Sequence, residues 1–202
     1  MRSAIILAGG KGSRLNFINK AFIKIRGRSL IEIVIENVKE VVDEVVISVA
    51  NEREKKFFEN ELGDTKIVKD IIEDFGPLAG ILTGLKNTKS EYSVVLACDM
   101  PFLNKDVIDF LFKNTRGYDA VIPKWEDDRV EPLHAVYKRE SMLKETEDAV
   151  NKGFKKILVP ICRLPRVKYI SVNEIAAIDP ELRTFVNINT LEDLKKLNIP
   201  KS

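Results

Sequence analysis

The stretch IILAGGKGSRL, residues 5–15, passes from an apolar run directly into a cluster of glycines. The apolar residues before it begin at Ser3 and are typical of a short buried strand. Gly9, Gly10 and Gly12 then release the backbone from the usual steric limits on φ, so that several N–H groups can converge on one anion. The pattern predicts a strand followed by a phosphate-binding loop, the first unit of an α/β fold.

Two cations follow these glycines. Arg14 supplies a planar guanidinium and Lys20 a compact ammonium, and together with the backbone dipoles they can spread the charge of a triphosphate. No Gly-Lys-Ser/Thr closes a Walker spacing, and Gly-x-Gly-x-x-Gly is also absent, so neither common nucleotide motif is present. The glycines alone would fit an ordinary strand-to-helix turn equally well, but the cations favour nucleotide chemistry.

The composition is that of an ordinary globular protein. The 202 residues are enough for one α/β domain, and 45% hydrophobic residues can form a full core. A net charge of +2 gives no indication of a nucleic-acid surface. No apolar run reaches the ~18 residues of a membrane helix, and the N-terminus lacks the pattern of a signal peptide. We expect a cytoplasmic protein without membrane or nucleic-acid partners.

The two cysteines and the single histidine limit which metal sites, disulfides and catalytic mechanisms the chain can have. Cys98 and Cys162 lie far apart and form no CxxC, which argues against a zinc site and a disulfide framework, and we expect both to be buried free thiols. His134 is the only histidine, so no mechanism can need a histidine pair. We expect His134 to be structural.

Strand and helix patterns alternate over about the first 115 residues. Phe22 to Ile25 is predicted to be extended, and Ser29 with Glu32 fits a capping box for a helix. Apolar, β-branched runs are typical of parallel strands buried on both faces. The predicted strands are 45–50, 66–68 and 93–97, and the predicted helices are 30–41, 53–62, 78–85 and 105–114. This order predicts a doubly wound sheet.

The rest of the chain is less regular. Its predicted strands are 120–123, 133–137 and 167–171, and its predicted helices are 141–152 and a last one capped by Thr190 that runs to about residue 197. No linker or repeat marks a boundary. We expect a single domain over residues 1–202, with a nucleotide-binding half to about residue 115 and an acceptor-binding half beyond it.

Polar residues at the ends of the predicted strands are the candidates for the site, because ligands of open α/β sheets bind at the carboxyl ends of the strands. Asp99 follows a buried strand and precedes Pro101, which can begin the next helix. Magnesium is usually held by one or two carboxylates together with substrate phosphates. Asp99 is therefore a candidate Mg²⁺ ligand, although a helix N-cap is the alternative.

A second acid precedes a glycine-proline turn. The carboxylate of Asp70 could accept hydrogen bonds from guanine or from a ribose hydroxyl, and Asp74 could do the same, but either could also be a solvated loop acid. Gly76, Gly80 and Gly84 at helical spacing would let a helix pack closely, either on a base or on the sheet.

The acceptor half offers two further candidate features. Alternation along residues 185–190 predicts a strand with Asn187 and Phe185 on one side and Asn189 beyond it, and the two amides could reach a metal or a phosphate. As an alternative, Asn189 simply belongs to the cap of the last helix. Trp125, in a polar stretch, could stack on a flat acceptor or could pack on the rim of the fold.

Several motifs in this order resemble the molybdenum cofactor guanylyltransferases over nearly the whole chain. The motifs are Leu7-Ala8-Gly9-Gly10 with Ser13-Arg14 and Lys20, Gly76-Pro77-Leu78-Ala79-Gly80, Cys98-Asp99-Met100-Pro101-Phe102, Glu131-Pro132-Leu133 with Ala135-Val136-Tyr137, and Asn187-Ile188-Asn189-Thr190. Related cytidylyl enzymes usually carry Ala-Ala-Gly at the first motif, whereas this chain has Ala8-Gly9-Gly10, which favours guanine.

The resemblance implies a Rossmann-like nucleotidyltransferase fold with three layers around a mostly parallel sheet. It also implies transfer of GMP from GTP to molybdopterin with release of pyrophosphate, and possible transient contact with cofactor-carrying proteins. The implied residues are Lys20, Arg14 and Asp99 for catalysis, Leu7, Ala8, Gly9, Gly10, Lys20, Asn51, Asp70 and Asp99 for the nucleotide, Asp99 for Mg²⁺, and Asn187 and Asn189 for the acceptor. Trp125 is added to the acceptor residues because its ring could stack there.

Two alternatives remain open at this point. The same chemistry could act on another phosphorylated acceptor, such as cobinamide phosphate or phospholactate. A non-catalytic module that binds GTP is the alternative from a different class, and the presence of both Lys20 and Asp99 argues against it.

Overall fold

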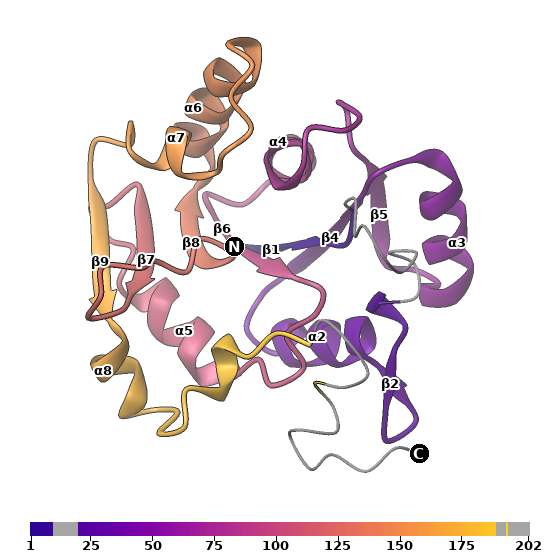
Figure 1. Ribbon diagram of the computed structural model, residues 1–202, viewed down its shortest axis with the longest axis horizontal. Coiled ribbons are helices and arrows are strands. Elements are labelled where there is room, and N and C mark those ends of the chain that lie inside the picture. Colours follow the sequence, from indigo (N-terminus) through magenta and orange to yellow (C-terminus); the bar gives the residue numbers. More distant parts are fainter. Residues whose placement is uncertain (10–19, 189–192, 194–202) are drawn as a thin grey trace.

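The computed structural model describes residues 1–9, 20–188 and 193, and its centre is one seven-stranded sheet (Figure 1). The strands follow the order β5-β4-β1-β6-β8-β7-β9 across the sheet. Their bounds are β1 Arg2–Leu7, β4 Glu44–Val49, β5 Lys66–Lys69, β6 Tyr92–Ala97, β7 Ala120–Lys124, β8 His134–Lys138 and β9 Val167–Ser171. A separate two-stranded hairpin consists of β2 Lys24–Ile25 and β3 Arg28–Ser29.

Strand direction decides where a ligand can bind. Strands β5, β4, β1 and β6 are mutually parallel, β8 is antiparallel to both β6 and β7, and β9 is parallel to β7. Within this sheet only β8 is reversed, so the carboxyl ends of the other six strands share one edge. The α/β fold with a mostly parallel sheet is confirmed.

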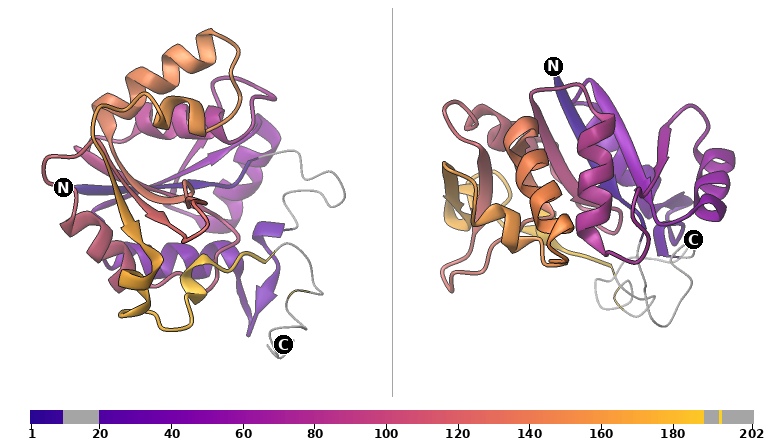
Figure 2. Two further views of the ribbon diagram at one scale, coloured as in Figure 1. Left: turned by 60° about the vertical axis from the view of Figure 1, so that its left-hand side comes forward. Right: turned by 90° about the horizontal axis from the view of Figure 1, so that it is seen from above.

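Helices cover both faces of this sheet and make a three-layer structure (Figure 2). The helices are α2 Leu30–Lys39, α3 Glu52–Leu62, α4 Pro77–Asn87, α5 Lys105–Lys113, α6 Arg139–Asn151, α7 Leu158–Ile161 and α8 Val172–Ala176, with a 3₁₀ turn η1 at Arg183–Phe185. Ile6 of β1 packs in the core with α2 and α5, whereas Ile5 packs on the opposite face with α4 and α6. Burial on both faces explains why the strands are apolar without alternation.

Most predicted elements are confirmed within one to three residues at each end. Ser29 forms the predicted capping box with Glu32. The predicted extended piece is a hairpin whose turn residues, Arg26 and Gly27, both have positive φ, the conformation that a tight two-residue turn requires. Helices α7 and α8 were not predicted, because each spans barely one turn and leaves little periodicity. The last predicted helix, capped by Thr190, lies outside the described residues.

Two local predictions are wrong. Pro101 does not begin the next helix, which starts at Lys105 with Asn104 as its N-cap, so Asp99 does not cap it either. Cys162 is exposed rather than buried, because it ends the short helix α7 at the surface, while Cys98 is buried as predicted. No helix in the described part of the chain is long and apolar enough to cross a membrane.

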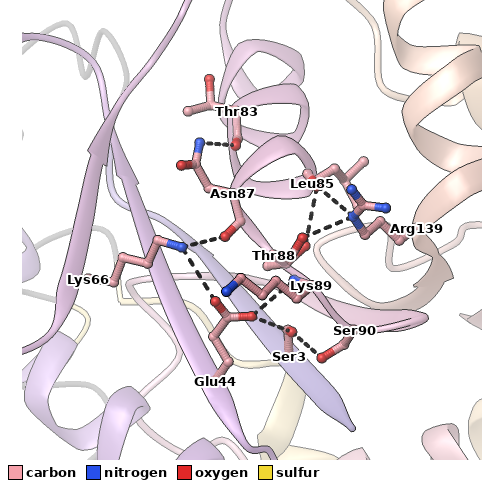
Figure 3. Close-up of polar contacts among 10 residues, drawn as sticks. All are labelled: Ser3, Glu44, Lys66, Thr83, Leu85, Asn87, Thr88, Lys89, Ser90 and Arg139. Carbon is pink, nitrogen blue, oxygen red and sulfur yellow. Dashed lines mark hydrogen bonds and ion pairs between the residues drawn. The ribbon is translucent and has the colours of Figure 1, made fainter.

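Polar contacts fasten the C-terminal end of α4 to strand β5 and to the first residue of α6 (Figure 3). The Lys66 ammonium donates to the carbonyl of Asn87 at 2.5 Å, and the Arg139 guanidinium donates to the carbonyl of Thr88 at 2.9 Å. Carbonyls at the end of a helix have no partner within the helix, so the two cations act as its C-terminal cap. Their positive charges also interact favourably with the negative end of the helix dipole. Glu44 of β4 accepts from both Ser3 and the backbone N–H of Lys89.

Helix α4 packs directly on β1 through glycine. A Cβ at Gly84 would lie 2.3 Å from Cγ2 of Ile5, and a Cβ at Gly80 would lie 2.9 Å from Cδ2 of Leu7. Close packing on the sheet is thus confirmed for Gly80 and Gly84. Gly76 makes no such contact and is instead the N-cap of α4, with a φ of +69°.

Gly84→Ala should therefore destabilise the fold even though alanine is the better helix former. The new methyl group would overlap the Ile5 side chain, and we expect a loss of about 2 kcal/mol in the free energy of unfolding. The double variant with Ile5→Ala should lose less than the sum of the two single variants, because the overlapping atoms are gone. Urea unfolding measures both effects, and a Gly84→Ala protein more stable than wild type would contradict this packing.

Candidate active site

The central strands β1 and β6 end side by side at the sheet edge where six strands terminate. The chain after β1 turns away through Ala8 and Gly9, and the chain after β6 continues into Cys98 and Asp99. The N–H of Cys98 donates to the carbonyl of Leu7 at 3.2 Å, which holds the two strand ends together. Since β1 and β6 are adjacent but their next strands lie on opposite sides, this is a topological switch point, where α/β sheets bind ligands.

Gly9 fits where no other residue would. A Cβ at this position would lie 2.4 Å from the backbone nitrogen of Ala50 and 2.8 Å from the backbone carbon of Val49. Neither neighbour can move like a flexible side chain, so the glycine is required for the loop to leave β1 against the end of β4. Gly9, the first glycine of the predicted loop, therefore follows directly after β1 as expected. Gly10 and Arg14 lie outside the described residues.

Lys20 and Asp99 form an ion pair at the end of β6. The Lys20 ammonium contacts Oδ2 of Asp99, and the two side chains are only 15% and 12% exposed. The other carboxylate oxygen, Oδ1, is buried and accepts no hydrogen bond from the described residues. A buried carboxylate oxygen without a hydrogen bond costs free energy unless a ligand supplies the missing interaction. The structure thus brings these two candidate residues together, and Oδ1 of Asp99 remains available for a ligand.

The oxygen of Asp99 suits a hard divalent cation. Magnesium takes carboxylate oxygen and usually completes its shell with substrate phosphate and water. Within the described residues no group of three or more His, Cys, Asp and Glu could hold a metal. A cation bound here would therefore rely on Asp99 together with oxygens of the substrate.

Asp70 lies at the end of β5, buried beneath the start of α4. It is 7% exposed, and its Oδ1 accepts a hydrogen bond from the hydroxyl of Ser48 on β4. Burial raises the pKa of Asp70 to about 6, against the opposing effect of the Ser48 hydrogen bond. Asp74 is exposed in the following loop, and its carbonyl accepts from Lys155. Of the two acids, Asp70 is the one placed at the strand ends.

Asp70→Asn should stabilise the unliganded protein near neutral pH. Because burial raises the pKa of Asp70 from 3.8 to about 6, the folded chain holds this proton more tightly, and stability falls as the pH rises between these values. Asparagine carries no charge to desolvate, so we expect a gain of about 1–3 kcal/mol at pH 7.5 and none below about pH 3. Urea titrations at both pH values measure it, and an equal gain at both would contradict this origin.

Asn51 begins α3 immediately behind the glycine loop. Its Oδ1 accepts from the N–H of Glu54 at 3.0 Å, and its Nδ2 donates to the Glu54 carboxylate at 3.2 Å. The side chain thus acts as a helix N-cap, and α3 opens with its positive dipole end beside Gly9.

The C-terminal segment runs directly past Asp99. The N–H of Ile188 donates to the backbone carbonyl of Asp99 at 2.9 Å, and the neighbouring Asn187 is exposed. The predicted strand over residues 185–190 is wrong for its described part, because Phe185 ends the 3₁₀ turn η1 and only the residues after it are extended. Asn187 is nevertheless brought to the site, whereas Asn189 lies outside the described residues.

Trp125 borders a separate hollow of about 360 Å³ near the carboxyl ends of β7 and β9. Its Nε1 donates to the Glu131 carboxylate at 2.6 Å, its ring meets Phe185 edge-on at 5.7 Å, and the Arg129 guanidinium lies 5.2 Å from it. Trp125 therefore packs on the rim as in one of the alternatives, while it also lines a cavity. The segment from Leu182 to Ile188 connects this cavity with Asp99.

The remaining reactive side chains, His134 and Cys98, also lie at this edge of the sheet, but both are buried. His134 is fully buried against Thr184 and Phe185, and burial lowers its pKa to about 3, so it stays neutral. Cys98 is buried, which raises the pKa of its thiol to about 12. Neither can act as a base or a nucleophile near neutral pH.

Sequence reasoning missed Ser48. Its hydroxyl contacts Asp70 and its carbonyl accepts from the N–H of Ala8 at 2.8 Å. A single hydroxyl inside an otherwise apolar strand was the available signal, because the neighbouring strand ends in an acid.

Comparison with known proteins agrees with this geometry. Residues 4–164 match the family model described as the MobA-like NTP transferase domain. The probable molybdenum cofactor guanylyltransferase of Methanosarcina mazei is 44% identical over 97% of this chain and 89% of its own, and that of Clostridium perfringens is 37% identical over 97% and 96%. The solved structure of molybdopterin-guanine dinucleotide biosynthesis protein A from Archaeoglobus fulgidus superposes with a TM-score of 0.81, at 34% identity over 97% of this chain and 96% of that one.

Proposed function

Since the chain belongs to the MobA-like NTP transferase family and is a nucleotidyltransferase, we propose that it transfers GMP from GTP to the phosphate of molybdopterin and releases pyrophosphate. The observation that carries this proposal is the buried Lys20–Asp99 pair at the switch point between β1 and β6. Lys20 supplies one cation and Asp99 one carboxylate oxygen without a hydrogen-bond partner among the described residues, and both support phosphate chemistry at this edge.

The reaction is an in-line displacement at phosphorus. A phosphate oxygen of the acceptor attacks the α-phosphorus of GTP, the new P–O bond forms, and the bond to the bridging oxygen breaks so that pyrophosphate leaves with the electron pair. Such a nucleophile is already ionised at pH 7 and needs no general base, which agrees with the inert His134. Positioning and electrostatic stabilisation then supply most of the rate.

The residues divide this work. Lys20 and Arg14 neutralise the phosphates. Leu7 and Ala8 lead into the loop, where the N–H of Ala8 is bonded to the Ser48 carbonyl, and the backbone N–H groups of Gly9 and Gly10 are assigned to the phosphates. Asp99 would hold Mg²⁺, which when bound supplies further positive charge on the phosphate oxygens. We assign Asn51 and Asp70 to the nucleoside, and Asn187, Asn189 and Trp125 to the acceptor. Asn187 next to Asp99 and Trp125 beside its cavity support that assignment.

Pyrophosphate release distinguishes this proposal from its alternatives. The protein is incubated with Mg²⁺ and molybdopterin, and GTP, CTP and ATP are compared in parallel. We expect release with GTP alone. Release only with cobinamide phosphate or phospholactate would replace the acceptor, and tight GTP binding without turnover on any acceptor would favour the non-catalytic module.

A further inference from the structure

Ser48 occupies an unusual place for a polar residue. It lies in the central part of the sheet on β4, is 1% exposed, and has apolar neighbours Ile47 and Val49 that are also buried. A hydroxyl in such a position costs free energy unless it finds a partner. Here the hydroxyl donates to Oδ1 of Asp70, a residue 22 positions further along the chain.

The backbone of Ser48 joins the same residue to the glycine loop. Its carbonyl accepts from the N–H of Ala8 at 2.8 Å, at the point where β1 ends and the loop begins. The N–H of Asp70 in turn donates to the carbonyl of Val49 at 2.8 Å. One residue of β4 thus sets both the start of the loop and the carboxylate of Asp70.

The space around this contact is left by a glycine of α4. A Cβ at Gly80 would lie 3.4 Å from the Ser48 hydroxyl and 3.6 Å from Oδ1 of Asp70. The Asp70 carboxylate is held by Oδ1 alone among the described residues, since Oδ2 accepts no hydrogen bond there. Only one of its two oxygens is therefore committed to the protein.

The charges around Asp70 do not explain its orientation. The residues that face Asp70 from β4 and α4 are neutral: Ser48 on β4, and Gly80 and Thr83 on α4. The Thr83 hydroxyl accepts a hydrogen bond from the N–H of Ile71 at 3.0 Å. Among the described residues, the charged side chain that acts on Asp70 is Glu54 of α3, which raises the pKa further. Within this part of the chain no cation offsets the burial, and the Ser48 hydroxyl is the group that favours the ionised form.

We infer that Ser48 is a positioning residue for nucleotide binding: it holds Oδ1 of Asp70 and thereby presents Oδ2 to a hydroxyl or N–H donor of the nucleoside. This role rests on the proposed function, because it needs a nucleotide at the glycine loop. Ser48 touches no substrate atom itself and acts through Asp70. We therefore assign the Ser48 hydroxyl to nucleotide binding rather than to the stability of the fold.

Ser48→Ala tests this role through two readouts. Carbon-13 NMR of the carboxyl group follows the titration of Asp70 in the unliganded protein, and we expect its pKa to rise by about one unit above its value of about 6 when the donor is lost. Steady-state kinetics should show KM for GTP raised about tenfold with kcat within about twofold, since an interaction made equally in the ground and transition states is lost.

Two further variants make the test specific. Ser93 is also a fully buried serine in the sheet, but its hydroxyl has no hydrogen-bond partner among the described residues, so Ser93→Ala is a matched control expected to change neither readout. Adding Ser48→Ala to Asp70→Asn should raise KM no further than Asp70→Asn alone, because Ser48 acts through that carboxylate.

The outcomes separate this role from the proposed function. Three results would each overturn the positioning role while leaving the guanylyltransferase proposal intact. They are a wild-type pKa of Asp70 in Ser48→Ala, an unchanged KM for GTP in Ser48→Ala, and a KM in the double variant raised by the product of the two single effects. A wild-type protein that binds no nucleotide would overturn both together.

Discussion

Asp99→Ala is expected to reduce turnover at least about 1,000-fold while GTP binding weakens about tenfold or less. The carboxylate is buried at the end of β6 with Oδ1 unbonded, so it is the described group best placed to hold a divalent cation against the phosphates. Charge stabilisation of this kind matters most in the transition state, where negative charge is spread over the departing pyrophosphate. Pyrophosphate release and equilibrium binding of a non-hydrolysable GTP analogue measure the two effects.

Asp109→Ala is the matched control for Asp99→Ala. Asp109 is also a carboxylate paired with cations, Arg2 and Lys113, but it lies on α5 by the amino end of β1, away from the site. It should retain wild-type turnover. Unchanged turnover in Asp99→Ala would remove Asp99 from the mechanism, and an equal loss in both variants would indicate damage to the fold instead.

Lys20→Ala is expected to lower kcat/KM for GTP about 100- to 1,000-fold. The ammonium is largely buried beside Asp99. Its removal takes positive charge away from the phosphate site and leaves the Asp99 carboxylate without its cationic partner. The effect should be largest on kcat if Lys20 stabilises the leaving pyrophosphate, and largest on KM if it only holds the ground-state triphosphate.

A control lysine separates this effect from a general loss of charge. Lys105 pairs with Glu40 at the amino end of α5 and lies with Arg2 and Asp43 around a hollow at the amino end of β1. Lys105→Ala should leave kcat/KM within about twofold of wild type, since exposed ion pairs contribute little. If Lys20→Ala behaved in the same way, Lys20 would have no role in phosphate binding.

The local patterns of the sequence predict most of the fold. Runs such as 93–97 are apolar on both faces, which specifies a central parallel strand, and Ser29 with Glu32 specifies where α2 begins. The reversed direction of β8 was not predicted, because the run 133–137 carries no signal that distinguishes pairing in parallel from pairing in antiparallel fashion. Strand direction depends on contacts across the sheet that no local pattern encodes.

The same distinction applies to the site. The rule that ligands bind at the carboxyl ends of strands was enough to predict that the ends of β1 and β6 meet. The ion pair between Lys20 and Asp99, 79 positions apart, was not itself predicted. The rule does not say which hydroxyl supports which acid, so the contact of Ser48 with Asp70 required coordinates. The misplaced strand over residues 185–190 has a similar cause, since tertiary contacts of Thr184 with Asp179 and Asn104 favour a 3₁₀ turn over the extended form.

Formation of the dinucleotide product tests the central claim most directly. The protein is incubated with Mg²⁺, molybdopterin and GTP labelled at the α-phosphorus, and the labelled product is separated from free nucleotide. We predict that the label enters a molybdopterin-guanine dinucleotide in a one-to-one ratio with released pyrophosphate and that Asp99→Ala forms none. GTP that binds but leaves no label on molybdopterin, in a protein that folds normally, would contradict the account.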